Sequence, residues 1–381
     1  MPLCPLAKKC SGCQLQNLTY EEQLKMKQVK LIHLLGRYGH VNEIVGMEDP
    51  THYRNKVQAI FGFKNGRVIS GIYQSATGKI VETDGCLLED TAASRIIKTV
   101  RELCAPFKIK AFDLKTGRGF LRHVLVRRGF RSGEIMVVLV TAPGDFPSCS
   151  AFVKELVRRH PEITTVVWNV NPTDTPLFLG RESRVLYGAG SITEELLGLR
   201  FRLSPRSFYQ VNPVQTEVLY RTAREYADLT GKERVIDAYC GTGTIGLTMA
   251  SGAAELIGVE VNADAVADAR ENAKVNGVKN AKFYAADAGE FMEQMAKEGQ
   301  RADVVITDPP RAGCSPRFLR SLIKLAPKRI VYISCDPDTL ARDLNTLTRA
   351  GYKATKIQPV DMFPFTQHVE SIVCLTRTFD N

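Results

Sequence analysis

The chain has 381 residues, of which 44% are hydrophobic and 24% charged, so it can bury a large core and is too long for one small domain. Its longest uncharged apolar stretch, residues 135–142, is much shorter than the roughly 20 residues that span a bilayer, and residues 1–13 lack the apolar core of a signal peptide. With 51 Lys and Arg against 41 Asp and Glu, the net charge of +10 favours a polyanionic partner such as nucleic acid. We therefore expect a two-domain cytoplasmic protein, monomeric and without a membrane partner.

Three of the ten cysteines open the chain: Cys4, Cys10 and Cys13 are separated by five and then two residues, and Cys86 offers a distant fourth thiol. Without an export signal these thiols should be reduced, so their grouping indicates a metal rather than disulfides. Four sulfur ligands suit either tetrahedral zinc or a [4Fe-4S] cluster. Zinc ribbons usually contain two CxxC pairs, and the single pair here favours the cluster.

The segment after the cysteines predicts one helix. Thr19 and Glu22 fit a capping box, and apolar residues follow at helical spacing up to Gly36, so we expect a helix over residues 20–36. This helix belongs in sequence to the amino-terminal region, and we expect it to pack on the carboxyl-terminal domain.

Residues 53–187 read mainly as short strands broken by Gly and Pro, with helical stretches near 90–103 and 150–159. The turn-like sequence FRSG separates residues 120–128 from 134–142, which predicts a β-hairpin. We expect this half, residues 1–198, to form a β-rich α+β domain that carries the cysteines and binds RNA.

Basic and aromatic residues alternate around this hairpin. Basic groups neutralise phosphates and aromatic faces stack on unpaired bases, so the stretch fits single-stranded RNA, although a solvated hairpin with core aromatics fits equally well. The residues concerned are Lys108, Lys110, Lys115, Arg118, Arg122, Arg127, Arg128 and Arg131, with Phe112, Phe120 and Phe130; Arg54 and Lys56 are further candidates.

After residue 199 strands alternate regularly with helices. The strands are RVIDAYC, LIGVEV, KFYAAD, VVITD, RIVYIS and SIVCLTR, and the helices are expected at 244–251, 264–276, 290–297, 316–325 and 338–349. This alternation predicts a Rossmann-like, doubly wound and mostly parallel sheet over residues 199–381, with ligands at the carboxyl ends of its strands.

The first of these strands runs into GTGTIG, whose glycines allow a ligand to approach the backbone before a helix begins. The glycines alone fit a dinucleotide, S-adenosylmethionine or a tight turn without a ligand. Asp237, Glu260 and Asp287 lie at successive strand ends, where a carboxylate can accept from ribose hydroxyls. Asp308 begins the sequence DPPR, for which a dehydrogenase has no evident need, so together these residues favour S-adenosylmethionine.

Two segments near the carboxyl terminus offer a nucleophile and a base. Cys335 follows the strand RIVYIS and precedes a helix, whose amino terminus favours a thiolate although neighbouring aspartates oppose it. His368 and Glu370 are two residues apart and should share one face of the last strand. Spacing does not decide which of the two is the base.

With these segments the chain resembles the RNA uracil-5-methyltransferases, S-adenosylmethionine-dependent enzymes that make 5-methyluridine in rRNA and tRNA. The resemblance covers nearly the whole chain, because the first cysteines match the iron–sulfur members of the family. The motifs occur in order as SFYQVN at 207–212, DAYCGTGT at 237–244, DPPR at 308–311, SCDPDTLARD at 334–343 and FPFTQHVE at 363–370.

The resemblance implies that Cys335 adds to carbon 6 of uracil, that carbon 5 then accepts the methyl group, and that Glu370 removes the proton from carbon 5. It implies that Cys4, Cys10, Cys13 and Cys86 hold a [4Fe-4S] cluster. The residues expected to bind S-adenosylmethionine are Gln210, Tyr239, Thr244, Glu260, Asp287 and Asp308. Phe208 is a candidate wall for stacking on the base.

The resemblance also bears on the substrate. Many family members carry a TRAM domain ahead of the cysteines, whereas this sequence opens on them, as in the shorter rRNA enzymes, so 23S rRNA is the expected partner. Three other functions are compatible with parts of the sequence: an amino-methyltransferase acting on a base, a NAD-dependent oxidoreductase, and a non-catalytic RNA-binding protein.

Overall fold

The structure is a computed structural model that describes residues 4–114, 116–172 and 178–378. The chain divides into two compact units. The first comprises Met1–Asn17, Pro50–Glu195 and Arg202–Arg206, and the second comprises Leu18–Asp49, Leu196–Phe201 and Ser207–Asn381. The helix predicted over residues 20–36 therefore belongs to the same unit as the carboxyl-terminal half. Within the described residues, no helix has the length and apolar character needed to cross a membrane.

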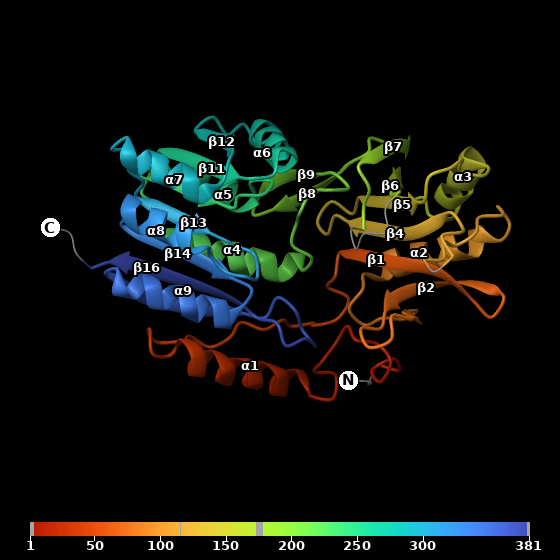
Figure 1. The fold of residues 1–381 in the computed structure, drawn as a ribbon, viewed down its shortest axis with the longest axis horizontal. Helices are drawn as coiled ribbons and strands as arrows, with labels where there is room; N and C mark the ends of the chain where they lie inside the picture. Colours follow the sequence, from red (N-terminus) through yellow and green to blue (C-terminus); the bar gives the residue numbers. More distant parts are fainter. Residues whose placement is uncertain (1–3, 115, 173–177, 379–381) are drawn as a thin grey trace. The chain divides into compact units, whose positions relative to one another are not determined.

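The first unit is built on a seven-stranded sheet (Figure 1). All neighbouring strands are antiparallel except β5 and β6, and the β4–β5 pair confirms the predicted hairpin. Two helices bury apolar side chains against the sheet, including Ile96 and Phe152. In spatial order the strands are β3 (Ile80–Glu82), β2 (Arg67–Tyr73), β1 (Lys56–Lys64), β4 (Leu121–Arg128), β5 (Ile135–Thr141), β6 (Ile163–Val170) and β7 (Glu182–Tyr187), and the helices are α2 (Thr91–Cys104) and α3 (Cys149–Arg159).

The second unit confirms the predicted doubly wound, mostly parallel sheet of a class I methyltransferase fold. Five strands are parallel, and β16 is antiparallel to both of its neighbours. In spatial order the strands are β12 (Ala281–Ala285), β11 (Glu255–Glu260), β10 (Arg234–Ala238), β13 (Val304–Thr307), β14 (Arg329–Ser334), β16 (Glu370–Arg377) and β15 (Tyr352–Val360). A separate two-stranded sheet consists of β8 (Ile192–Leu196) and β9 (Leu199–Leu203).

The helices of the second unit agree with the sequence pattern except in one place. The bounds are α4 (Pro213–Ala227), α5 (Thr244–Met249), the short 3-10 helix η1 (Ala250–Gly252), α6 (Ala263–Val275), α7 (Ala288–Lys297), α8 (Pro316–Leu325) and α9 (Pro337–Arg349). Helix α4 is additional to the prediction. Its start follows from Asn212, whose side chain accepts from the Gln215 N–H, and from a proline at the first helical position.

Helix α1 (Tyr20–Leu35) begins at the predicted capping box. Thr19 Oγ1 accepts from the Glu22 N–H at 3.3 Å, and Glu22 Oε2 accepts from the Thr19 N–H at 2.7 Å. The helix lies beside α9 in Figure 1. Its buried face contains two polar side chains, Gln23 and Lys27, in line with Leu31 and Leu35. Buried polar side chains require partners, and these are described below.

Candidate active site

The pairing of β14 with β16 brings Cys335 and Glu370 together. In this antiparallel pair Ser334 lies opposite Ser371, so the residue after Ser334 faces the residue before Ser371. Those two residues are Cys335, which is half-buried, and Glu370, which is 2% exposed. The sequence placed both at strand ends, and the register makes them neighbours.

The parallel strands add carboxylates to the same edge of the sheet. Thr307, the last residue of β13, pairs with Ala238 of β10 and with Tyr332 of β14, so Asp308 follows directly at the carboxyl edge. Glu260 closes β11 at that edge. Carboxyl ends of parallel strands are where open α/β sheets bind ligands.

The electrostatics of this edge confirm that the groups are close. Burial raises the pKa of Asp308 to about 7. Burial, and then the charge of Asp308, raises the pKa of Glu370 well above its ordinary value. Burial followed by the charges of Glu370 and Asp308 raises the pKa of the Cys335 thiol to about 11. The resting site therefore favours the neutral thiol form of Cys335.

Arg311, the last residue of DPPR, opposes these shifts. Its charge lowers the pKa of both Cys335 and Glu370, and its guanidinium contacts the ring of His368. Sequence reasoning gave Arg311 no role, although it stands inside a motif that we singled out. His368 is exposed and Glu370 is buried next to Cys335, so the geometry separates two candidate bases that spacing left equal.

Asp343 fixes the loop that carries Arg311. This carboxylate is fully buried and accepts from the Cys314 N–H and from the Tyr332 hydroxyl, both at 2.7 Å from Oδ2. Thr339 Oγ1 donates to the Arg311 carbonyl at 3.2 Å. Helix α9, which begins two residues after Cys335, thus fixes the loop after β13.

The glycine loop has the shape of a ligand cradle. The Gly246 N–H donates to Asp237 Oδ2 at 2.8 Å, and a Cβ at Gly246 would lie 2.7 Å from that oxygen, so only glycine fits. Asp237 is fully buried and its Oδ1 has no hydrogen-bond partner among the described residues. Gly241, with φ of +53°, donates from its N–H to Glu260 Oε2 at 3.2 Å. A fixed carboxylate beside an open backbone turn fits the ribose of an adenosine cofactor.

The remaining residues predicted to bind the cofactor differ in how strongly other contacts already engage them. Tyr239 has φ of +64° and packs its half-buried ring against Phe318, with 5.1 Å between ring centroids, and Gln210 is 8% exposed. Thr244 begins α5 and its hydroxyl lies 3.2 Å from the Tyr220 hydroxyl. Asp287 is exposed and caps α7 through the Glu290 N–H at 2.9 Å, so this carboxylate already has a structural function.

Phe208, the candidate stacking residue, is 66% exposed. Its backbone carbonyl accepts from Thr242 Oγ1 of the glycine loop at 3.4 Å. This exposure is compatible with stacking on an unpaired base.

The four predicted metal ligands lie in the first unit and are all half-buried. Burial raises the pKa of the Cys13 thiol, and the charges of Cys10 and Cys4 raise it further. Burial also raises the pKa of the Cys86 thiol, and the charges of Glu89 and Cys13 add to that shift. In the part of the chain that the structure describes, no three His, Cys, Asp or Glu side chains are arranged to hold a metal ion. The structure therefore does not support the metal centre, which stays a prediction.

The basic stretch around the hairpin is partly structural. Arg122 and Arg127 are 3% and 1% exposed, and donate to the carbonyls of Asn171 and Ser204 at 2.9 and 3.2 Å. Phe120 packs on core aromatics, and Lys115 lies outside the described residues. These side chains follow the core interpretation rather than the RNA interpretation. The exposed members are Lys108, Lys110, Arg118, Phe130 and Arg131.

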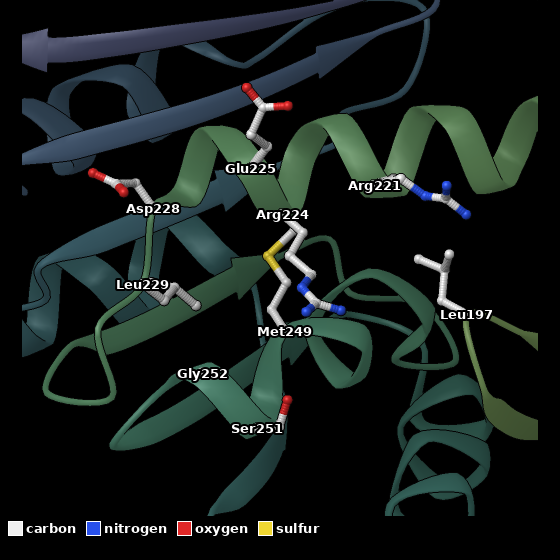
Figure 2. Close-up of a pocket in the computed structure, with 9 residues that line it drawn as sticks. All are labelled: Leu197, Arg221, Arg224, Glu225, Asp228, Leu229, Met249, Ser251 and Gly252. Atoms are coloured by element: carbon white, nitrogen blue, oxygen red, sulfur yellow. The ribbon is translucent and has the colours of Figure 1, made fainter.

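A separate hollow lies on the second unit (Figure 2). Its volume is about 930 Å³, and it is lined by Arg221, Arg224, Leu229, Met249 and Gly252, among others. Leu229 and Gly252 precede β10 and β11, so this hollow is at the amino ends of the strands, opposite Glu260 and Asp308. It is not the cofactor site that the glycine loop indicates.

Comparison with known proteins agrees with the geometry. The model of a family described as tRNA (uracil-5-)-methyltransferase matches residues 192–378. Proteins called uncharacterized RNA methyltransferases from Oceanobacillus iheyensis and Clostridium tetani are each 43% identical, over 98% of this chain and 82% of the relative. The solved Pyrococcus abyssi tRNA (uracil-54, C5)-methyltransferase, in complex with S-adenosyl-L-homocysteine, is 31% identical over 98% of this chain and 86% of that one, with a TM-score of 0.81.

The charges around Cys335 predict how its thiol reacts. Since the pKa is about 11, alkylation by iodoacetamide should rise about tenfold per pH unit from pH 7.5 to 9.5, whereas a free thiol levels off near its ordinary pKa. Glu370→Gln removes a charge that raises the pKa and should speed alkylation at pH 8; Arg311→Gln should slow it. Mass spectrometry of the Cys335 peptide measures both rates. Equal rates in the two variants would contradict this electrostatic account.

Proposed function

This chain belongs to the tRNA (uracil-5-)-methyltransferase family of S-adenosylmethionine-dependent RNA methyltransferases, and on that premise we propose that it methylates carbon 5 of a uridine in RNA through a covalent adduct with Cys335. The observation that carries the proposal is the register of β14 and β16, which sets Cys335 beside the buried Glu370. Addition to a uracil ring and later elimination from it require a nucleophile and a proton acceptor that lie close together, as Cys335 and Glu370 do at the ends of two paired strands.

Cys335 opens the reaction. Its half-buried thiol releases a proton to solvent, which Arg311 favours and the nearby carboxylates oppose. The thiolate Sγ forms a bond to carbon 6, and the electron pair of the carbon 5–carbon 6 double bond moves to carbon 5 and the carbon 4 carbonyl as an enolate. Carbon 5, otherwise a poor nucleophile, can then accept an electrophilic methyl group.

The cofactor supplies a methyl group on a positive sulfonium, whose carbon–sulfur bond breaks with its electron pair staying on sulfur. In our proposal Gln210, Tyr239, Glu260 and Asp308 hold it, with Thr244 and Asp287 at neighbouring positions. The cradle at Gly241 and Gly246 and the fixed Glu260 carboxylate support this assignment.

Glu370 closes the reaction. It takes the proton from carbon 5, the double bond re-forms, and the Cys335 thiolate leaves carbon 6. Burial and the charge of Asp308 raise the proton affinity of Glu370, which makes it a stronger base than an exposed carboxylate once it is ionised. An amino-methyltransferase would need neither the thiol nor this elimination step.

We propose 23S rRNA as the substrate, because the spacing of Cys4, Cys10, Cys13 and Cys86 is similar to that of the iron–sulfur rRNA enzymes of the family. A second candidate is tRNA, since the similar Pyrococcus abyssi enzyme is described as acting on uracil-54 of tRNA. The target uracil must leave its stack to reach Cys335 in either case.

We further propose that Cys4, Cys10, Cys13 and Cys86 bind a [4Fe-4S] cluster, with zinc as the alternative. The donor chemistry is supported by four cysteines of one unit whose spacing is similar to that of the iron–sulfur members of the family. No step of the methyl transfer is assigned to this group. Ordering of the first unit, or of its RNA contacts, is its proposed function.

A trapping experiment tests the mechanism. RNA with 5-fluorouridine at the target cannot lose a proton from carbon 5, so the wild-type protein should form a complex stable in SDS. Cys335→Ser should form none and lose turnover by a factor on the order of 10³ or more. The matched control is Cys374→Ser, because Cys374 is a buried thiol on β16 that donates to the Tyr226 carbonyl. This variant should still trap RNA. Full methylation by Cys335→Ser would overturn the covalent mechanism.

Mapping of 5-methyluridine distinguishes the substrates. A strain that lacks this protein should lose the modification at a uridine of 23S rRNA, and the purified protein should restore it in vitro on that rRNA. Loss confined to tRNA would reject 23S rRNA in favour of the second candidate, and loss of an N-methylated base would reject both.

Metal analysis tests the cysteines. Protein purified without oxygen should contain about four iron and four sulfide per chain and absorb visible light. Cys86→Ser should lose both, whereas Cys149→Ser, at a half-buried thiol of the same unit, should keep them. Stoichiometric zinc without iron would identify the alternative, and the absence of both metals would remove the proposed centre.

A further inference from the structure

The segment that delivers Glu370 to the site is an irregular loop. Residues 361–369 join β15 to β16, and Glu370 is the first residue of β16. Within the loop Phe365 has φ of +67°, a left-handed conformation that is strained for a non-glycine residue. Such a conformation persists only where surrounding contacts impose it.

Helix α1 provides contacts of this kind at the start of the loop. Lys27 Nζ donates to Asp361 Oδ1 at 2.7 Å and to the Phe363 carbonyl at 3.2 Å. The Tyr20 hydroxyl donates to the other oxygen of Asp361 at 3.0 Å. Lys27 and Asp361 are 1% and 0% exposed, so their ion pair is shielded from water.

A second contact reaches the strained residue itself. Gln23 Oε1 accepts from the Phe365 N–H at 2.8 Å, while Gln23 Nε2 donates to the Leu18 carbonyl at 3.1 Å. Gln23 is 0% exposed, and its two bonds fix the amide orientation. One turn of α1, from Gln23 to Lys27, therefore contacts the loop at Asp361, Phe363 and Phe365.

Stability alone does not explain why polar residues occupy these buried positions. A buried ion pair loses much of its Coulomb energy to desolvation, and apolar side chains of similar size often stabilise a core as well or better. A charged pair that also donates to a loop carbonyl imposes a geometry that apolar packing would leave variable. The geometry in question is that of the backbone entering Glu370.

We propose that Lys27 and Gln23 are positioning residues, which hold loop 361–369 in the one conformation that sets the Glu370 carboxyl beside Cys335. This inference rests on the proposed function of Glu370 as the base. In that reaction Glu370 acts only after the methyl group has reached carbon 5. A displaced Glu370 should therefore slow breakdown of the methylated Cys335 adduct without slowing its formation.

The test is a single-turnover experiment with methyl-labelled S-adenosylmethionine and substrate RNA, quenched in SDS. Lys27→Met and Gln23→Leu should each accumulate labelled RNA bound to protein, with release of methylated RNA slowed by roughly 10- to 100-fold, the size expected for a displacement of about 1 Å. Affinity for S-adenosylmethionine should stay within about twofold of wild type. Lys30→Met is the matched control, because Lys30 lies on α1 in an exposed pair with Asp338 and should release RNA normally.

Two further variants keep the result decisive. Glu370→Gln sets the benchmark, and its failure to accumulate the adduct would refute the proposed function itself. If Glu370→Gln accumulates the adduct and folded Lys27→Met and Gln23→Leu do not, the positioning role is wrong. If the Lys27→Met protein does not fold, the double variant Lys27→Met and Asp361→Leu takes its place, because it removes both charges of the buried pair. Rapid release of methylated RNA by this double variant would overturn the inference.

Discussion

The antiparallel pairing of β16 with β14 is the constraint on which the candidate site depends. If β16 were parallel to the other strands, its last residue would lie at the ligand-binding edge of the sheet and its first residue at the opposite edge. Reversal of this one strand brings its first residue, Glu370, to the edge where β14 delivers Cys335. The same sheet thereby brings the proposed cofactor residues of β10, β11 and β13 to the edge at which the adjoining pair places the proposed nucleophile and base.

Charge at that edge is concentrated and largely uncompensated. Asp237, Asp308 and Glu370 are all placed where burial raises the pKa, and Arg311 is the cation whose charge acts on both Glu370 and Cys335. Proteins retain such destabilising groups where chemistry needs them, because a solvated carboxylate would be a weaker base. Capping of α9 by Asp336, which accepts from the N–H groups of Asp338 and Thr339, also means that this helix end contributes little to ionising the thiol.

Local patterns predicted most of the fold. The capping box at Thr19 gave the start of α1, and the bounds of α8 agree with the expected 316–325. Helix α4 was missed although Asn212 and Pro213 mark its start, and β15 was missed because its sequence mixes polar residues and a proline. The burial of Arg122 and Arg127 was also missed, since their partners, Asn171 and Ser204, are 49 and 77 residues away in sequence. For the same reason spacing could not choose between His368 and Glu370, because the choice depends on which of them a distant strand approaches.

The contact between Lys27 and Asp361 joins residues that are 334 positions apart. A nascent chain leaves the ribosome from its amino terminus, so α1 waits for almost the entire polypeptide before its buried lysine meets a counter-charge. During synthesis the glycine loop and the strand that carries Cys335 can form earlier, while Glu370 and its supporting helix remain apart. Glu370 can therefore take its place beside Cys335 only after nearly the whole polypeptide has been made.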